Sequence, residues 1–112
     1  MASFSELELE VIRWSEARKI IPNSTPFAQS IKAVEEINEL VDALRDDNKA
    51  EAIDAVGDTL VCLINVCALL DVNLTDCLAA AYNEIKDRKG HMNAEGIFVK
   101  AVECSETWLG WA

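Results

Sequence analysis

The sequence has few of the residues that build zinc sites or sheet-rich folds. It holds a single histidine, His91, and four cysteines, none of which forms a Cys-x-x-Cys pair. We therefore expect no zinc site, because zinc is held by Cys and His ligands at short spacing. Glycine and proline are also scarce, at four and two residues, whereas Ala, Leu, Glu, Asp and Val are common. That balance favours helices over sheets.

Basic residues are outnumbered two to one. Ten Lys and Arg stand against 20 Asp and Glu, which gives a formal net charge of −10. A chain this acidic would be repelled by a nucleic-acid backbone, so we expect no nucleic-acid partner. A small anionic ligand could bind only where a metal ion or a local basic patch reverses the sign of the charge.

The sequence also lacks a long hydrophobic run and a basic leader. The first residues carry an acid, Glu6, where a signal peptide has basic residues. The longest apolar run, Leu60–Leu70, is interrupted by Asn65 and is shorter than the roughly 20 residues of a membrane span. We therefore expect no membrane association, a cytoplasmic location, and free cysteines that act as small apolar side chains.

A chain of 112 residues is long enough for one domain with one core, so we expect a single domain over residues 1–112. Apolar residues at helical spacing predict four helices, at about 5–19, 26–45, 49–70 and 74–89. The expected fold class is therefore all-α, as a four-helix bundle.

Local signals mark the ends of the predicted helices. Thr25, Asn48 and Asn73 are good N-caps for the last three helices, and Gly90 is expected to end the fourth. The third helix is apolar nearly all round after Thr59, so we expect it to be the central, most buried helix.

The second predicted helix carries one apolar stripe, which we expect to face the core. The stripe comprises Ile31, Val34, Ile37, Leu40, Val41 and Leu44. In the tail, residues 91–112, a short extended piece is expected at Gly96–Lys100. Trp108 and Trp111 need a surface to pack on, and a partner subunit is one candidate.

Acidic residues recur on the second and third predicted helices. At 100° per residue, a polar stripe of the third helix falls within about 60°; it comprises Glu51, Asp54, Asp58 and Asn65. On the second helix, Glu35, Glu36 and Glu39 lie together beside the apolar stripe. A short link makes the two helices antiparallel neighbours, so the two sets of acids can converge.

Converging carboxylates repel one another unless a divalent cation lies between them. Oxygen ligands without His or Cys favour Mg²⁺, with Mn²⁺ as the alternative. Magnesium shares its coordination shell with phosphates, so the substrate is expected to be a phosphate ester or phosphoanhydride. A polar and basic group near the end of the fourth helix is expected to hold the remaining phosphate oxygens; it comprises Asn83, Lys86, Arg88 and Lys89.

Some of these residues also have structural interpretations. Glu35 can be a solvated surface acid, Glu51 can complete a capping box with Asn48, and the basic group can complement a helix C-terminus. Asp54 and Asp58 are harder to explain in this way because their helix is so apolar. Gly57 lies between them and costs about 1 kcal/mol of helix propensity against Ala. Close approach of a ligand or another backbone would explain it.

Several segments carry a resemblance to a known family. KAVEEINEL at residues 32–40, followed by EAIDAVGDTL at 51–60, resembles the MazG-like all-alpha NTP pyrophosphohydrolases. The pattern of that family is EExxE, a gap, and an ExxD-type element. The segment 81–90 is similar to its phosphate-contacting segment. Trp14 and the run Pro22-Asn23-Ser24 resemble the nucleoside-contacting start of its compact members.

The resemblance implies magnesium-dependent hydrolysis of a (d)NTP to (d)NMP and pyrophosphate, with nucleotide-pool housecleaning as a role. Glu36, Glu39 and Asp58 match the metal-binding acids, and Glu36 or Glu39 is expected to act as the catalytic base. The fourth ligand is either Asp54 or Glu51, because Ala55 stands where many members have Glu.

The same resemblance assigns substrate contacts and an assembly. Trp14 and Asn23 are expected at the nucleoside, and Asn83, Lys86 and Arg88, with Lys89, at the phosphates. A homodimer or homotetramer is implied.

The acidic helices are also compatible with two other classes of protein. A di-iron carboxylate bundle needs Glu-x-x-His elements, and the only histidine lies outside the acidic helices. A non-catalytic helical dimer that binds nucleotides or a protein partner stays open, because Ala55 departs from the family pattern. Magnesium-dependent pyrophosphate release from a panel of nucleotides distinguishes the enzyme from such a binding protein.

Overall fold

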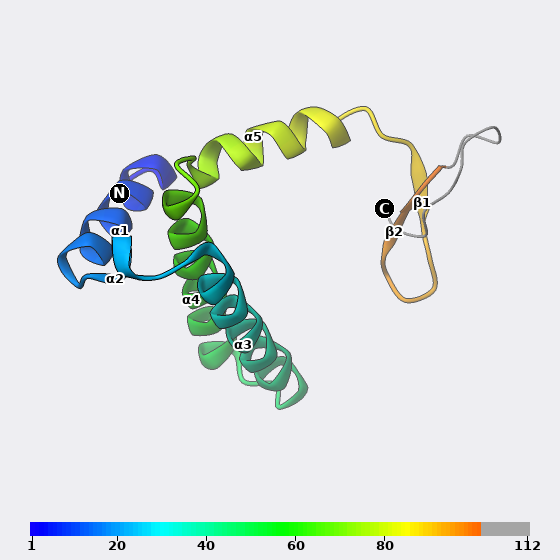
Figure 1. The fold of residues 1–112 in the computed structure, drawn as a ribbon. Coiled ribbons are helices and arrows are strands. Elements are labelled where there is room, and N and C mark those ends of the chain that lie inside the picture. The colour runs from blue at the N-terminus through cyan, green and yellow to red at the C-terminus, as the bar shows by residue number, and fades with distance from the viewer. Residues whose placement is uncertain (102–112) are drawn as a thin grey trace. The chain divides into compact units, whose positions relative to one another are not determined.

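The computed structural model describes residues 1–101, so Cys104, Trp108 and Trp111 lie outside the described residues. The long elements of the described part are all helices, which confirms the predicted fold class (Figure 1). The helices are α1 (Phe4–Ala17), α2 (Ile20–Asn23), α3 (Pro26–Arg45), α4 (Lys49–Leu69) and α5 (Leu74–Ile85). Two short strands follow, β1 (Gly90–Met92) and β2 (Phe98–Lys100). The chain forms two compact units, residues 1–78 and the residues from 79 onward.

The predicted N-caps are confirmed. The Thr25 hydroxyl accepts a hydrogen bond from the Ala28 N–H at 3.0 Å, and Pro26 occupies the first turn of α3. The Asn48 side chain accepts from the Glu51 N–H at 3.2 Å, and Asn73 accepts from the Asp76 N–H at 2.8 Å. Each cap satisfies a backbone donor that the first turn of a helix leaves unpaired.

Two predicted helix ends are wrong. The first helix stops at Ala17 rather than residue 19, because Lys19 adopts a left-handed conformation with φ of 68°, and the one-turn helix α2 follows it. The fourth helix stops at Ile85 rather than residue 89.

Gly90 does not end that helix. It pairs with Lys100 in an antiparallel hairpin of β1 and β2, where a Cβ would collide with the Val99 carbonyl. Close backbone approach in a hairpin therefore explains this glycine. The extended piece expected at 96–100 is present as β2, whereas β1 was not predicted.

α4 is the central helix of the first unit, as predicted, since it packs against α1, α2 and α3. Figure 1 shows α3 and α4 as an antiparallel hairpin. The two helices bury small side chains, Ala33 and Ala43 of α3 and Ala52 and Ala55 of α4. By length and composition α4 is also the one described helix that could cross a membrane, a test that the core helix of a soluble protein passes as well.

The orientation of the α3 stripe differs from the prediction. Ile31, Val34, Ile37, Val41 and Leu44 are 41–64% exposed, and the packed side of α3 carries Ala33, Glu36 and Ala43 instead. α3 approaches α4 through small residues, which turns the large side chains away from α4. We call these five exposed residues the uncovered face of α3.

A buried polar network fixes the part of α4 beyond Thr59. The Ser15 hydroxyl donates to the Asn65 Oδ1 at 2.6 Å, and the Asn65 amide donates to the Gln29 Oε1 at 3.1 Å. Gln29 in turn donates to the Ser24 hydroxyl at 3.0 Å. Ser15 is fully buried and Asn65 is 2% exposed. The network therefore ties α1, α3 and α4 together with every buried partner satisfied. Cys62, Cys67 and Cys77 are free thiols, as expected.

Candidate active site

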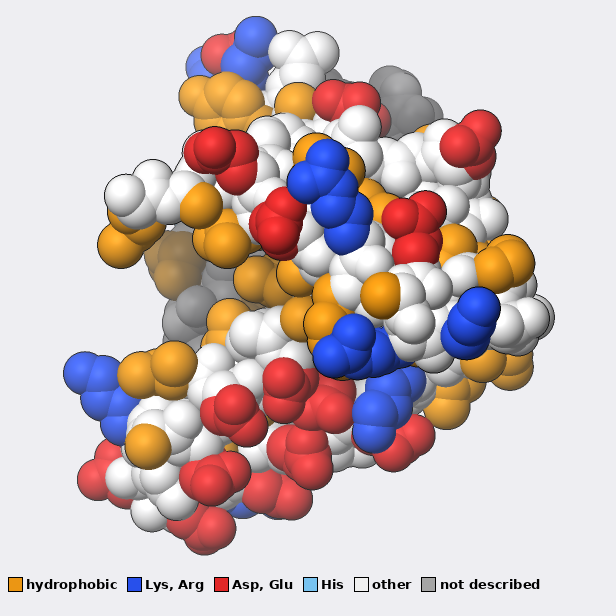
Figure 2. Space-filling model, turned by 90° about the vertical axis from the view of Figure 1, so that its left-hand side faces the viewer, with side chains coloured by type: hydrophobic (Ala, Val, Ile, Leu, Met, Phe, Trp, Pro, Cys, Tyr) orange, Lys and Arg blue, Asp and Glu red, His pale blue; other side chains and the backbone are white. Residues whose placement is uncertain are grey.

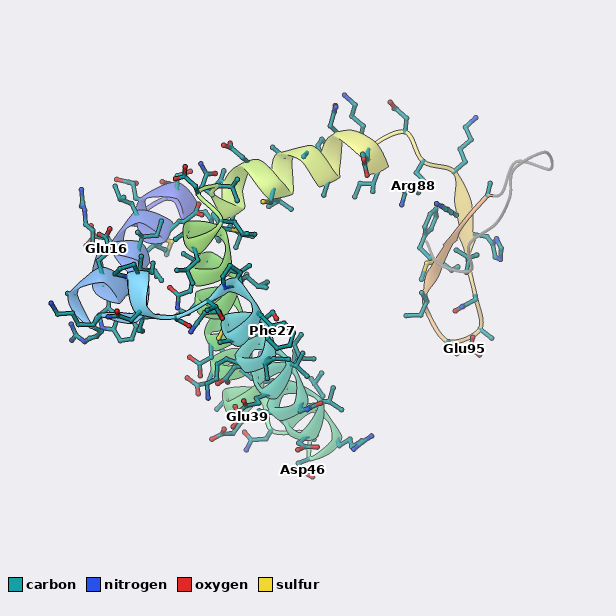
Figure 3. The ribbon with its side chains drawn as sticks, in the orientation of Figure 1. Glu16, Phe27, Glu39, Asp46, Arg88 and Glu95 are labelled. Carbon is teal, nitrogen blue, oxygen red and sulfur yellow. The ribbon has the colours of Figure 1, made fainter. Side chains whose placement is uncertain are left out.

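An open pocket of about 440 Å³ lies between α3 and α4, near the turn that joins them. Seven carboxylates line it, together with Ala43, Asn48 and Ala55. The carboxylates are those of Glu36, Glu39, Asp42, Asp46, Glu51, Asp54 and Asp58. Acidic side chains gather in the lower part of the face drawn in Figure 2, and Figure 3 shows Glu39 and Asp46 toward the lower end of α3. Among the described residues that line the pocket there is no Lys, Arg or His.

Helical spacing brings these acids together. On α3, Glu36 and Glu39 are three residues apart, and Ala43 and Asp46 continue the same row. On α4, Glu51, Asp54 and Asp58 follow steps of three and four residues. Residues at such steps share one helix face, and two antiparallel faces then meet. The structure therefore brings together Glu36, Glu39, Asp54, Asp58 and Glu51, although their roles as ligands stay predictions.

Glu36 is the buried member of the cluster. It is 8% exposed, and its Oε2 has no hydrogen-bond donor among the described residues. The adjacent Glu39 carboxylate raises the pKa of Glu36 above its ordinary value, since sharing a proton favours the neutral form, and burial raises it further. Lys32, on the preceding turn of α3, opposes this shift. A buried, unpaired carboxylate oxygen is costly and is stabilised by a cation.

Asp58 has a related environment. Desolvation raises its pKa first, and the negative charges of Asp54 and Glu36 raise it further. Within residues 1–101, no three His, Cys, Asp or Glu side chains lie close enough to form a ready-made metal site. The donor set nevertheless fits a hard divalent cation, because it offers only oxygen ligands and includes one orphaned buried oxygen. Holding such an ion requires these side chains to draw together.

The Glu51 carboxylate is not taken up by a capping box. The Asn48 side chain accepts from the Glu51 N–H, but the Asn48 N–H donates to the Ala43 carbonyl at 2.8 Å. The reciprocal bond of a capping box is therefore not formed. Glu51 keeps its carboxylate on the pocket wall.

Sequence reasoning missed three residues of this region. Asp42 and Asp46 line the pocket and follow Glu39 at steps of three and seven residues, so the helical row that found Glu39 could also have found them. Lys32 lies one turn before Glu36, and its Nζ is 3.6 Å from the Glu36 Oε1.

The remaining predicted residues of the first unit lie outside this pocket. Glu35 is exposed, and its carboxylate is 3.7 Å from the Lys32 Nζ. Trp14 is 45% exposed and carries the Arg18 guanidinium 5.1 Å from its ring centroid. The Asn23 amide donates to the Lys19 carbonyl at 2.9 Å. Contact of Trp14 and Asn23 with a nucleoside stays a prediction.

The polar and basic group lies in the second unit. Asn83 is in the last turn of α5, and Lys86, Arg88 and Lys89 follow the helix and are exposed. The basic side chains therefore do not occupy the last turn of α5. Their contact with phosphate stays a prediction.

Comparison with known families identifies the chain. The model of the phosphoribosyl-ATP pyrophosphohydrolase family matches residues 15–85, which is more than half of the chain and includes both rows of acids. The chain belongs to this family. The predicted MazG-like membership is thereby confirmed.

A solved structure agrees with this membership. It is described as the cyanophage S-2L MazG-like pyrophosphohydrolase bound to dGDP and three catalytic Mn²⁺ ions per active site. It matches with a TM-score of 0.68 and 24% identity, over 91% of this family member and 100% of that chain. At this identity the match establishes the fold.

A relative of known sequence comes from Haemophilus phage HP1. It is an uncharacterised 18.2 kDa protein of the rep-hol intergenic region, 35% identical over 65 residues. The match covers 57% of this family member and 39% of the phage protein. The chain therefore spans about two fifths of the length of that relative.

Proposed function

We propose that this chain is a nucleoside triphosphate pyrophosphohydrolase that forms NMP and pyrophosphate, with Mg²⁺ as the working metal and Mn²⁺ able to replace it. The observation that carries the proposal is the seven-carboxylate pocket with its unpaired, buried Glu36 oxygen. Family membership supports the reaction. The structural neighbour, described with dGDP and Mn²⁺, supports the nucleotide and the metal.

Glu36, Glu39 and Asp58 would hold the metal, with Asp54 or Glu51 as the fourth ligand. When bound, a divalent ion neutralises phosphate charge and activates a water for attack on the phosphoanhydride. Glu39 is better placed than Glu36 to position and deprotonate that water, because its side chain is exposed to the pocket whereas Glu36 is buried. Asp42 and Asp46 extend the negative wall and would hold further cations with their phosphates.

Substrate contacts complete the proposal. Asn83, Lys86 and Arg88, with Lys89, would hold the outer phosphates, because cationic donors match phosphate oxygens. Trp14, whose ring is half exposed, would stack on the base, and Asn23 would contact the nucleoside. Lys86→Ala should then weaken binding of a triphosphate far more than binding of the nucleoside. Equal loss for both ligands, measured by calorimetry, would contradict the phosphate role.

The chain is proposed to act as a homodimer or homotetramer. The uncovered face of α3 leaves five large apolar side chains exposed, and Ile53, Val56 and Leu60 of α4 are exposed as well. A second copy would bury such a surface. Sedimentation should show at least a dimer, and Val34→Glu should weaken the assembly, because Val34 is 54% exposed and its replacement leaves the intrachain core intact. A 12.4 kDa monomer at micromolar concentration would contradict this.

The decisive experiment distinguishes cleavage of the α–β phosphoanhydride bond from cleavage of the β–γ bond. A panel of NTPs and dNTPs is incubated with the protein and Mg²⁺, and pyrophosphate and orthophosphate are measured separately. We expect NMP and pyrophosphate from at least one nucleotide, and no turnover in excess EDTA. Accumulation of NDP and orthophosphate, or turnover undiminished by EDTA, would overturn the proposal.

The panel also tests the biological role. In the cytoplasm such an enzyme would clear unwanted nucleotides from the nucleotide pool. The nucleotide that is hydrolysed most rapidly would then identify its physiological substrate. Tight nucleotide binding without any release would identify a non-catalytic binding protein.

A further inference from the structure

Lys32 is the cation that contacts the buried acid of the pocket. Its Nζ lies 3.6 Å from the Glu36 Oε1 and 3.7 Å from the Glu35 Oε1. Arg45 pairs with another pocket acid, Asp42, at 3.8 Å, but both of those side chains are more than 70% exposed. Of these three ion pairs, Lys32–Glu36 is the one whose acid is buried, with a side chain only 10% exposed. Burial weakens solvent screening, so this pair interacts more strongly than the exposed ones.

The charge of Lys32 affects acids on both helices of the pocket. It lowers the pKa of Glu36 and of Asp58, against the neighbouring acids that raise both. Glu35 and then Glu36 raise the pKa of Lys32 itself, so the side chain stays protonated. Lys32 therefore favours the ionised form of one acid on α3, Glu36, and of one acid on α4, Asp58.

Lys32 neutralises the charge of Glu36 only in part, and their ion pair can easily be broken. Of the two carboxylate oxygens of Glu36, Oε1 pairs with Lys32, while Oε2 has no donor within the described residues. The Lys32 side chain is 54% exposed, and a lysine is a flexible point charge on a four-carbon stem. Lys32 can therefore leave Glu36 for another anion without disturbing the packing of α3 on α4.

We propose that Lys32 couples metal binding to nucleotide binding: it is the counter-ion of Glu36 in the free protein and a phosphate-binding residue once metal and substrate are present. The inference rests on the proposed function. A positive charge this close to a ligand oxygen opposes the entry of a bare divalent cation. The anionic oxygens of a triphosphate reverse that effect, because the same charge attracts them. The site then favours the metal–nucleotide complex over the metal alone, which is a positive coupling between two ligands.

The test measures Mn²⁺ binding to the folded protein, by the electron paramagnetic resonance signal of free Mn²⁺, with and without a triphosphate whose α,β-bridging oxygen is replaced by a methylene group. In Lys32→Gln we expect bare Mn²⁺ to bind about threefold more tightly, since a repelling charge is gone. The affinity of the analogue in saturating Mn²⁺ should fall about tenfold, since a charge-assisted contact is lost. These two changes have opposite signs.

Two matched variants isolate the effect. Lys49→Gln removes the same charge from the first turn of α4, where no ion pair is present in the described structure, and should leave both affinities near those of the wild type. Lys32→Arg keeps the charge and should preserve the coupling.

The outcomes separate this inference from the proposed function. If both affinities fall together in Lys32→Gln, or neither changes, the coupling role is wrong while the proposed function stands. If the wild-type protein binds neither Mn²⁺ nor the analogue, both are overturned.

Discussion

Two buried glutamates in the first unit lie in opposite environments. Glu8 of α1 is 4% exposed and accepts hydrogen bonds from the N–H groups of Leu74 and Thr75 and from the Thr75 hydroxyl, the last at 2.7 Å. Burial acts to raise the pKa of Glu8, but these three donors outweigh it, and the pKa is lowered. Glu36 of α3 is buried to a similar degree, yet its pKa is raised and one of its oxygens has no donor in the described chain.

The difference distinguishes a structural acid from a functional one. Glu8 lies on α1 and accepts from backbone donors in the first turn of α5 that would otherwise be unpaired, so hydrogen bonds within the fold stabilise its charge. Glu36 faces other carboxylates, so the fold alone leaves its charge uncompensated. A perturbed, unsatisfied acid in a pocket marks a place for a ligand, here a cation.

Glu36→Gln should therefore remove activity. The substitution keeps the shape of the side chain but loses a metal-binding charge, and metal ions contribute several kcal/mol to such reactions. Pyrophosphate release should fall by about two orders of magnitude or more. The control is Glu35→Gln, whose side chain is exposed and lies outside the pocket, and it should keep most of the activity. Comparable loss in both variants would mean that Glu36 has no special role.

The same substitution at Glu8 should act on stability instead. Glu8→Gln replaces one accepting oxygen by an amide that cannot accept, which leaves a part-buried donor of α5 unpaired and costs about 1–3 kcal/mol. Glu36→Gln should leave stability unchanged or raise it, because its amide can donate to the Glu39 carboxylate. Denaturant unfolding at pH 7 compares the two, with Glu16→Gln on the exposed side of α1 as control (Figure 3). If Glu36→Gln is instead less stable than the wild type, the fold does depend on the charge of Glu36, and the contrast with Glu8 is wrong.

The pH dependence of stability should also have opposite signs. Glu8 has a pKa below the ordinary value of 4.5, so its stabilisation is complete above pH 4.5 and is lost as the pH falls through its lower folded value. Glu36 has a pKa above 4.5, so its ionised form opposes folding at neutral pH and protonation relieves this as the pH falls toward 4.5.

Unfolding free energies of each Gln variant, measured from pH 8 to pH 4 without metal, test this. The advantage of Glu36→Gln over the wild type should shrink as the pH falls across that range. The deficit of Glu8→Gln should persist until the pH drops below 4.5. Parallel profiles for the two variants would show that both glutamates share one environment.

Local signals in the sequence were sufficient for the caps and for five of the seven acids that line the pocket. Thr25, Asn48 and Asn73 act within three residues of themselves, so their roles follow from chain-local geometry. The row of Glu51, Asp54 and Asp58 follows from helical periodicity alone. Antiparallel pairing through a short turn then brings it opposite Glu36 and Glu39.

Non-local packing accounts for what the sequence did not reveal. Glu8 contacts Thr75 across 67 residues, and no periodic pattern signals such a pair. The uncovered face of α3 was expected inside because its apolar stripe is strong, but the choice of Ala33 and Ala43 as the contact depends on the shape of α4. Gly90 resembles a helix stop until its pairing with Lys100 is known.

The smallest expected effect concerns Gly57, on the pocket helix between Asp54 and Asp58. The sequence suggested that close approach explains this glycine, yet a Cβ placed there meets no atom within 4 Å among the described residues. Gly57→Ala should therefore stabilise the metal-free protein by about 1 kcal/mol, the difference in helix propensity. Ala52→Gly in the same helix should cost at least as much, because Ala52 is also buried. Gly57→Ala can also be introduced into a monomeric variant such as Val34→Glu. If it destabilises the assembled protein but stabilises that monomer, another copy of the chain occupies the space next to Gly57. The glycine would then belong with Glu36, as a feature that the fold of one chain leaves unexplained, rather than with Glu8.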